Sequence, residues 1–213
     1  MIHVKRWQRY EDYLDRGDWH VHSSYADGMN TIFEYCQKAE AFGLDLIAFT
    51  EHVRKEMDYS YNRFLDDVRL ARERFDIRIL AGCEGKVLNL KGELDAPDEV
   101  LEECDVVIGS FHSFPYERVE EYLEAVHSML KNPHVDIWGH PTLLAQRRGF
   151  TLPDESIGQI EQECIENMVL MEKNLKYKVP PLRFLELTRG ARYVVGSDAH
   201  RIDDIYNLKE GSK

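Results

Sequence analysis

The chain has 213 residues, of which 43% are hydrophobic and 31% are charged, a composition typical of a globular protein with a sizeable core. Its 39 acidic residues outnumber its 27 basic ones, and the net charge of −12 provides no general attraction to nucleic acid. No apolar run is long enough for a membrane span, and the N-terminal segment has no apolar region of the signal-peptide kind.

Seven short segments rich in β-branched and aromatic residues are predicted to be strands. In chain order they cover residues 18–22, 45–52, 77–84, 105–112, 135–140, 168–172 and 193–200. The spacing of apolar residues predicts helices between them, over 30–43, 62–75 and 116–130. Alternating strands and helices indicate an α/β fold with a parallel sheet. Because the strands are almost continuously apolar, we expect a closed seven-stranded barrel, with an open doubly wound sheet as the alternative.

The domain organisation is expected to be simple. No repeat, low-complexity tract or linker divides the sequence, which predicts a single domain over residues 1–213. The four cysteines are scattered without a C-x-x-C pair, which favours reduced thiols and a cytoplasmic location. Nothing in the sequence indicates an oligomeric state.

The first strand lies in the segment DWHVHSSYADG (18–28), where polar and apolar residues alternate. Side chains two positions apart on a strand share a face, so Asp18, His20 and His22 are expected to project together. Trp19 and Val21 are then expected to pack behind them. The segment alone fits either a hydrogen-bonded cluster or part of a metal site.

Histidines gather at the carboxyl ends of the predicted strands. Six of the nine lie at such an end or just beyond it: His20, His22, His52, His112, His140 and His200. Three acids, Asp27, Glu84 and Asp198, hold comparable positions. In a β/α barrel these ends form one face, so we expect the nine side chains to meet there.

A metal site explains this pattern better than nine separate surface residues. Imidazole and carboxylate groups without thiolate suit Zn, Mn or Fe at a hydrolytic centre. Nine ligands exceed what one tetrahedral ion binds, which predicts two or three divalent ions with Glu84 as a bridge. Ions so arranged are suited to a phosphate ester and to making hydroxide from water.

The ordered motifs DWHVHSSYADG, FTEH, GCE, GSFHS, GHP and GSDAH resemble those of the PHP (polymerase and histidinol phosphatase) superfamily of metal-dependent phosphoesterases. The resemblance runs from about residue 18 to residue 200 and implies a distorted seven-stranded, TIM-like (β/α) barrel with a trinuclear site. It implies three ligand sets: His20, His22, Glu84 and Asp198; Glu84, His112 and His140; and Asp27, His52 and His200. Asp18 and Glu51 match acids that flank the ligands, where each is expected to accept the free N–H of a ligating histidine.

The predicted reaction is hydrolysis of a phosphate monoester of a small molecule, with a metal-bound hydroxide attacking phosphorus. Arg147 and Arg148 are the preferred candidates for binding the phosphate, because arginine offers a two-pronged donor. Histidinol phosphatases of the family carry a stretch like LEIN followed by an arginine. Here LMEKNLKYK (170–178) keeps Glu172 and Asn174 but differs afterwards, so histidinol phosphate itself is not predicted.

Two other functions remain open at this point. A phosphodiesterase or exonuclease acting on short oligonucleotides would need a basic groove with stacking aromatic residues, which the net charge opposes. A metal-dependent binding or regulatory module without turnover is opposed by the complete set of ligands.

Overall fold

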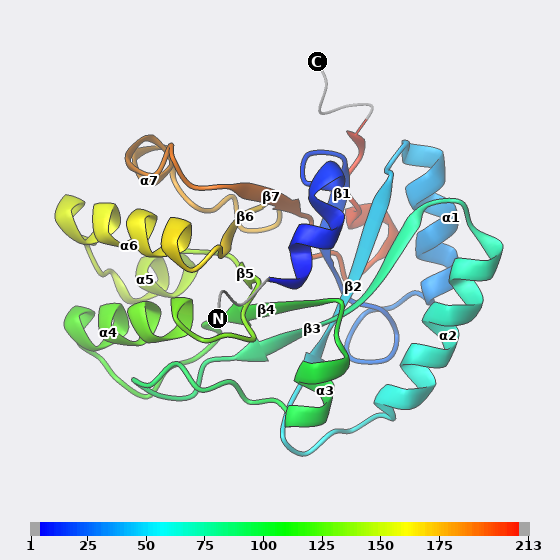
Figure 1. Cartoon of the computed structure of the whole chain (residues 1–213), viewed down its shortest axis with the longest axis horizontal. Helices are drawn as coiled ribbons and strands as arrows, with labels where there is room; N and C mark the ends of the chain where they lie inside the picture. The colour runs from blue at the N-terminus through cyan, green and yellow to red at the C-terminus, as the bar shows by residue number, and fades with distance from the viewer. Residues whose placement is uncertain (1–4, 209–213) are drawn as a thin grey trace.

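Seven parallel strands form one sheet in this computed structural model, which describes residues 5–208 (Figure 1). The two ends of the predicted 1–213 domain therefore lie outside the described residues. The strands lie in the sheet in chain order: β1 (Gly17–Val21), β2 (Leu46–Val53), β3 (Arg78–Lys86), β4 (Val106–Ser110), β5 (Ile137–Trp138), β6 (Leu170–Asn174) and β7 (Tyr193–Gly196). All seven predicted strands are confirmed, although β5 is much shorter than its predicted span.

The first and last strands meet and bring the sheet to a nearly closed barrel. Val21 and Ala199 form a parallel bridge. Nearby, the N–H of Asp198 donates to His20 O at 2.8 Å, and the N–H of His22 donates to Ala199 O at 2.9 Å. The predicted barrel is confirmed, and the open doubly wound alternative is wrong because β1 and β7 are not two free edges.

Helices flank the barrel on several sides (Figure 1). They are α1 (Ile32–Phe42), α2 (Tyr61–Arg74), α3 (Asp98–Glu103), α4 (Val119–Leu130), α5 (Leu143–Arg148), α6 (Asp154–Glu166) and α7 (Leu182–Leu187), with 3-10 segments η1 (Arg6–Tyr13) and η2 (Ile202–Asp204). The three predicted helices correspond to α1, α2 and α4. For α1, Thr31 and Glu34 form a reciprocal cap at the start, and Gly43 ends the helix with a φ of 79°.

Apolar residues fill two separate cores, one inside the barrel and one between the barrel and the helices. Along β2, Leu46 and Ala48 belong to the inner core, whereas Ile47 and Phe49 belong to the outer one. Since successive residues of a strand face opposite sides, both faces are buried. This double burial explains why the strands are continuous apolar runs.

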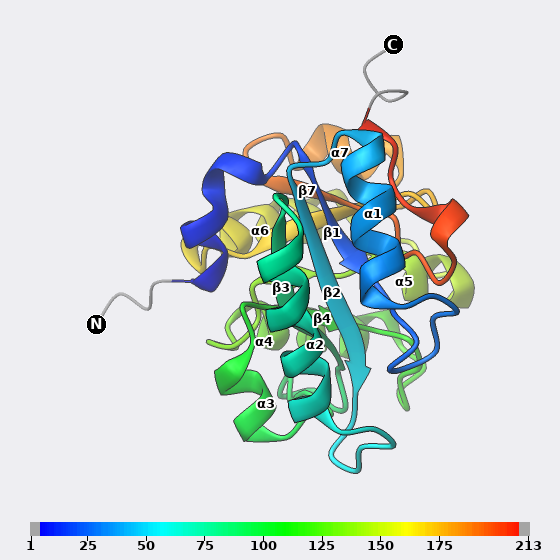
Figure 2. The same ribbon diagram turned by 90° about the vertical axis from the view of Figure 1, so that its right-hand side faces the viewer.

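The N-terminal segment covers one end of the barrel. Trp7, in η1, is 2% exposed, joins the inner core and donates its indole N–H to Met168 O at 2.7 Å. Lys5 is buried beside it, with Nζ 2.6 Å from Val135 O. The carboxyl ends of the strands lie at the opposite end, where the arrowhead of β2 leads into the loop that follows it (Figure 2).

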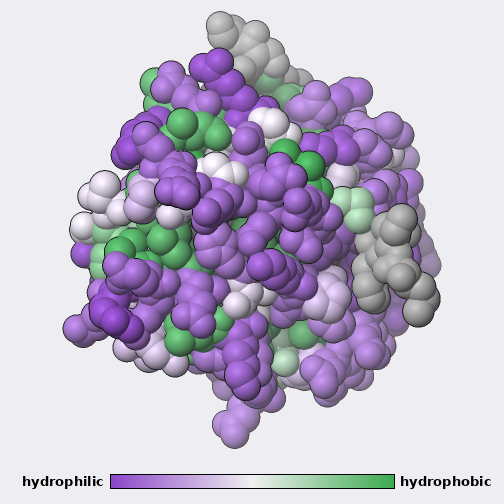
Figure 3. Space-filling model, turned by 60° about the vertical axis from the view of Figure 1, so that its left-hand side comes forward, coloured by the Kyte–Doolittle hydropathy of each residue, from purple (hydrophilic) through white to green (hydrophobic). Residues whose placement is uncertain are grey.

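Hydrophilic residues dominate the face shown in Figure 3, with apolar residues in smaller patches between them. Among the helices of residues 5–208, none combines the length and the apolar character required to cross a membrane.

Candidate metal centre

The nine candidate ligands gather at the carboxyl ends of the strands. His20 lies on β1 and His52 on β2, Glu84 lies on β3, and the other six follow a strand end directly or stand in the next loop: His22, Asp27, His112, His140, Asp198 and His200. Neighbouring imidazole centroids are 4.3 Å apart for His22 and His52 and 5.0 Å apart for His112 and His140. The structure therefore brings together every side chain in the predicted set.

Glu84 lies at the middle of this cluster and is 2% exposed. Its Oε1 is 2.9 Å from Nε2 of both His112 and His140, and its Oε2 is 2.9 Å from Nδ1 of His52. The Nε2 atoms of His20 and His22 are 3.4 and 3.5 Å from Oε2. Burial alone would raise the pKa of Glu84, but the surrounding imidazoles, His112 and His20 above all, hold that pKa well below its usual range.

Donor atoms from these residues form three groups, each compact enough to bind one ion. In each group the ligand atoms lie within 4.8 Å of one another: His22, Asp27, His52 and His200; His20, His22 and Asp198; and His52, Glu84 and His112. The groups share members, as expected for ions held by bridging ligands. They differ in detail from the predicted sets, because His22 and His52 each belong to two groups.

The chemistry of the donors fits a metal better than a hydrogen-bonded cluster. The Nε2 atoms of His20 and His22 are only 3.0 Å apart and both lie beside Glu84. On its other side, Nδ1 of His20 is 2.8 Å from a carboxylate oxygen of Glu172. A neutral His20 that donates its Nδ1 proton to this carboxylate presents the lone pair of Nε2 to the centre, as in a histidine that binds a metal.

Unusual backbone conformations fix two of the candidate ligands. His140 and Asp198 have φ values of 30° and 52°, in a region that few residues other than glycine adopt. The N–H of His140 donates to Glu172, and the N–H of Asp198 donates to His20 O. Backbone strain of this kind concentrates at functional sites, where neighbouring contacts maintain it.

Asp18 does not project with His20 and His22 as the alternation predicted. The pairing of β1 with β2 matches Asp18 to Ile47 and Val21 to Phe49, so β1 contains one extra residue. This bulge reverses the faces along β1, and Trp19 packs in the inner core. The predicted face was wrong because a bulge leaves no clear signal in the sequence.

The predicted contacts of Asp18 and Glu51 with ligating histidine rings are also wrong. The carboxylate of Asp18 accepts from the backbone N–H groups of Ser197 at 2.9 Å and Tyr206 at 3.0 Å. Glu51 accepts from the N–H of Ser23 at 2.9 Å, and its burial raises its pKa to about 7. Both acids thus hold loop backbone around the centre rather than imidazole rings.

Glu172 occupies the position that was expected of those two acids. It is 1% exposed, and besides His20 and the backbone of His140 it accepts from the amide of Asn174 at 3.0 Å. The sequence singled out Glu172 and Asn174 only as a match to a family stretch. Their alternation on a strand, with both side chains on one face, was the signal that could have placed them at the site.

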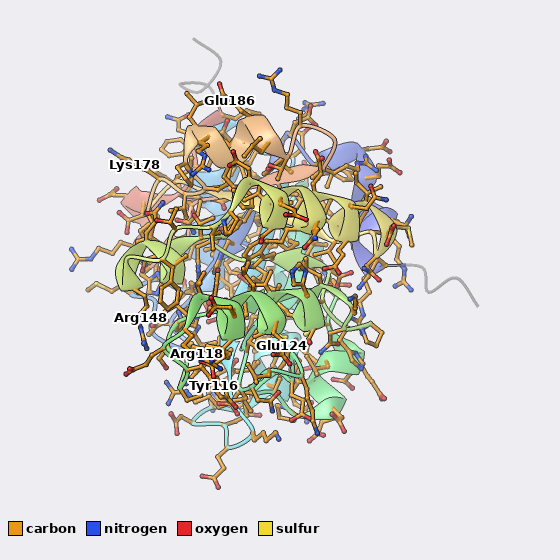
Figure 4. All side chains as sticks on the ribbon, turned by 90° about the vertical axis from the view of Figure 1, so that its left-hand side faces the viewer. Tyr116, Arg118, Glu124, Arg148, Lys178 and Glu186 are labelled. Carbon is orange, nitrogen blue, oxygen red and sulfur yellow. The ribbon has the colours of Figure 1, made fainter. Side chains whose placement is uncertain are left out.

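The two predicted phosphate-binding arginines lie at the rim and are partly engaged elsewhere. The guanidinium of Arg148 donates to Phe114 O at 2.9 Å and approaches Tyr116 O at 3.5 Å (Figure 4). It therefore holds the loop that follows His112. Arg147 lies 5.1 Å from the ring centre of Tyr177, whose ring in turn contacts His140.

Lys176 is a cation at the centre that the sequence analysis did not single out. Its Nζ is 3.0 Å from Oδ1 of Asp198 and 3.1 Å from Nδ1 of His200. The side chain is 36% exposed, so it can reach both the ligands and a molecule bound above them. Its position two residues after Asn174 places it just beyond β6.

The family model described as the PHP domain matches residues 18–176, about three quarters of the chain. The chain belongs to the PHP domain family. The chain is also similar to a "Probable phosphatase" of Acetivibrio thermocellus, which is 31% identical over 91% of this chain and 85% of the relative. A second relative, the DNA polymerase/3'-5' exonuclease PolX of Bacillus subtilis, is 30% identical over 92% of this chain but only 36% of its own length.

Solved structures share the PHP barrel. The hisK protein of Listeria monocytogenes, described as a histidinol phosphatase candidate, superposes with a TM-score of 0.71 at 17% identity, over 92% of this chain and all of that one. Histidinol phosphate phosphatase from Lactococcus lactis, solved with zinc, L-histidinol and phosphate, has a TM-score of 0.63 at 20% identity, over 93% of this chain and 94% of that one. At these identities the likeness establishes the fold.

Proposed function

We propose that this protein hydrolyses phosphate monoesters of small organic molecules at a centre of two or three divalent ions, with Zn, Mn and Fe as candidates. The observation that carries the proposal is the convergence of five imidazoles on the buried carboxylate of Glu84. The coarser class rests on family membership: a PHP chain whose curated relatives are named phosphatases is a metal-dependent phosphoesterase.

The proposed ligands are the nine side chains of the cluster, with Glu84 as the bridge. Divalent ions bound there would supply hydroxide from water near neutral pH and offset the charge of the phosphate. Glu172 would orient His20, and the bulge in β1 would direct that ring and His22 to one point. Asp198 and His200 approach Lys176, whose ammonium would bind a phosphate oxygen.

Two further cations are candidates for binding the phosphate. Arg54 and Lys86 line a cavity of about 540 Å³ together with His52, Glu84 and His112. Both follow or end a strand of the barrel, so they approach from the loops after β2 and β3. They replace Arg148 as candidates, since its guanidinium is bonded to loop carbonyls.

Metal analysis combined with a phosphate-release screen tests the proposal. We expect two or three ions per chain, from the number of nitrogen and oxygen ligands, and phosphate release from small monoesters. Asp198→Asn should lose at least one ion and about 100-fold or more in kcat/KM. Asp66→Asn, an exposed acid on α2, is the matched control and should behave as wild type. Full activity of Asp198→Asn, or no release from any ester with Zn, Mn or Fe present, contradicts the proposal.

A nuclease-type diesterase is the second candidate, and the likeness to PolX is the observation that favours it. The chain spans about a third of the length of that relative, so the relative's activity is not inferred for this chain from the match alone. Faster cleavage of a dinucleotide than of small sugar or amino-alcohol phosphates would establish this alternative.

A further inference from the structure

Two cavities open on the candidate metal centre and share part of their walls. Asp27, His52 and Arg54 line both. The larger cavity also contains Glu84, Lys86 and His112, so it combines candidate metal ligands with cations. The smaller one, about 170 Å³, lies between the loops after β1 and β2, and its remaining walls have no candidate ligand: Tyr25, Ala26, Glu56, Met57, Asp58 and Tyr59.

Hydrogen bonds already engage the polar ends of the two tyrosines in the smaller cavity. The hydroxyl of Tyr25 donates to Asp67 at 2.7 Å, and that of Tyr59 donates to His52 O at 3.2 Å. Their ring centroids are 5.9 Å apart, and both rings pack against the outer core beside the half-buried Met57. The rings and the thioether thus offer apolar and aromatic contact surface.

Size and charge limit what this cavity can take. A cavity of roughly 150 Å³ accommodates one benzene ring, so 170 Å³ fits a single ring and not a nucleoside. Arg54, on the wall shared with the larger cavity, is the one arginine or lysine in its lining, whereas Glu56 and Asp58 are exposed acids. A second phosphate would meet these carboxylates, while an uncharged or cationic group would not be repelled.

We propose that the smaller cavity binds the organic group of the phosphate ester, a single ring or an apolar group of that size, uncharged or cationic. This proposal rests on the proposed function, which puts the phosphate in the larger cavity. Met57 and Tyr59 are then specificity-determining residues. The same geometry disfavours dinucleotides, whose second nucleoside exceeds the space, and bisphosphates, whose second phosphate would meet the carboxylates of Glu56 and Asp58.

Calorimetry with two inert probes tests the pocket apart from turnover. Benzylphosphonate carries one ring and methylphosphonate carries none, and neither is hydrolysed. We expect the metal-loaded wild type to bind benzylphosphonate about tenfold or more tightly than methylphosphonate. Met57→Trp fills the cavity and should abolish this preference, so that the two phosphonates bind with similar affinity. Leu182→Trp, an exposed leucine on α7, is the matched control and should keep the preference.

A second pair of variants works in the opposite direction. Tyr59→Ala enlarges the cavity and should shift the preference towards naphthylmethylphosphonate, whereas Tyr59→Phe keeps the ring and should keep the preference for benzylphosphonate over methylphosphonate. Kinetics with benzyl phosphate and methyl phosphate should follow the same ratios in kcat/KM.

The outcomes separate the two proposals. If the wild type releases phosphate but Met57→Trp and Tyr59→Ala leave the benzyl-to-methyl ratio unchanged, the pocket assignment is overturned and the proposed function stands. If no ester is hydrolysed by the metal-loaded wild type, the proposed function fails, even where the phosphonates bind.

Discussion

Two buried carboxylates, those of Glu84 and Glu172, contact the histidines of the candidate centre from different sides. Glu84 faces the imidazoles from inside the cluster, and Glu172 contacts His20 from behind. The sequence predicted Glu84 because it ends a strand among other candidate ligands. It missed the role of Glu172, because the acid that supports a histidine lies on another strand, 152 positions away. Support from distant strands depends on barrel geometry, which motif spacing does not encode.

Replacing Glu172 with glutamine tests this role. The amide keeps the size of the side chain but has only one oxygen, so either the His20 ring or the backbone N–H of His140 faces an NH2 group and loses its acceptor. We expect metal affinity, measured by competition with a chelator, to fall by about 10- to 100-fold. Glu166→Gln, an exposed acid at the end of α6, serves as the control. Unchanged metal affinity in Glu172→Gln would show that Glu172 does not support the metal ligands.

At the level of elements, the strands were predictable because each is an apolar run with a polar end. Helix α1 was predictable from its cap at Thr31 and its terminal Gly43. Helix α6 was not predicted, although Ile157, Ile160 and Cys164 recur on its buried face. The bulge in β1 was beyond prediction, since it results from how β1 pairs with β2 rather than from local sequence.

Replacing two glycines with alanine should change the free energy of unfolding in opposite directions. Gly92 has a φ of 70°, and a Cβ there would lie 2.4 Å from the backbone N of Met129, so Gly92→Ala should destabilise the protein by about 2 kcal/mol or more. Gly158 is inside α6 with no heavy atom within 4 Å of an added Cβ. Gly158→Ala should therefore stabilise by about 0.8 kcal/mol. Urea unfolding measures both, and equal effects of the two variants would contradict the backbone argument.

At the scale of the whole molecule, the two ends of the barrel differ in the residues that they carry. Polar ligands occupy the end where the strands terminate, and the N-terminal segment covers the other. At that covered end Asp136 is buried and accepts from the N–H of Val107 at 3.0 Å, while Lys5 donates to nearby carbonyls. Burial lowers the pKa of Lys5 to about 8, with the charge of Asp136 opposing the shift.

This buried lysine makes stability depend on pH in a defined direction. The unfolded chain keeps the Lys5 proton up to about pH 10.5, whereas the folded protein releases it near pH 8. The unfolded state therefore binds more protons in that window, and the free energy of unfolding should rise with pH. Between pH 8 and pH 10.5 the free energy of unfolding of the wild type should rise by about 3 kcal/mol relative to that of Lys5→Met. A constant difference between the two proteins, measured by urea unfolding at several pH values, would contradict the shift.

The junction between β1 and β7 also has a consequence for the order of assembly. Asp18 and the N–H of Ser197 are 179 positions apart, yet their bond lies directly beneath the candidate ligands. During synthesis on the ribosome, the early histidines emerge long before the segment that completes their surroundings. The nascent chain thus has no complete cation-binding set until residues 198–200 have been synthesised, and the long loop that must close makes this a slow event.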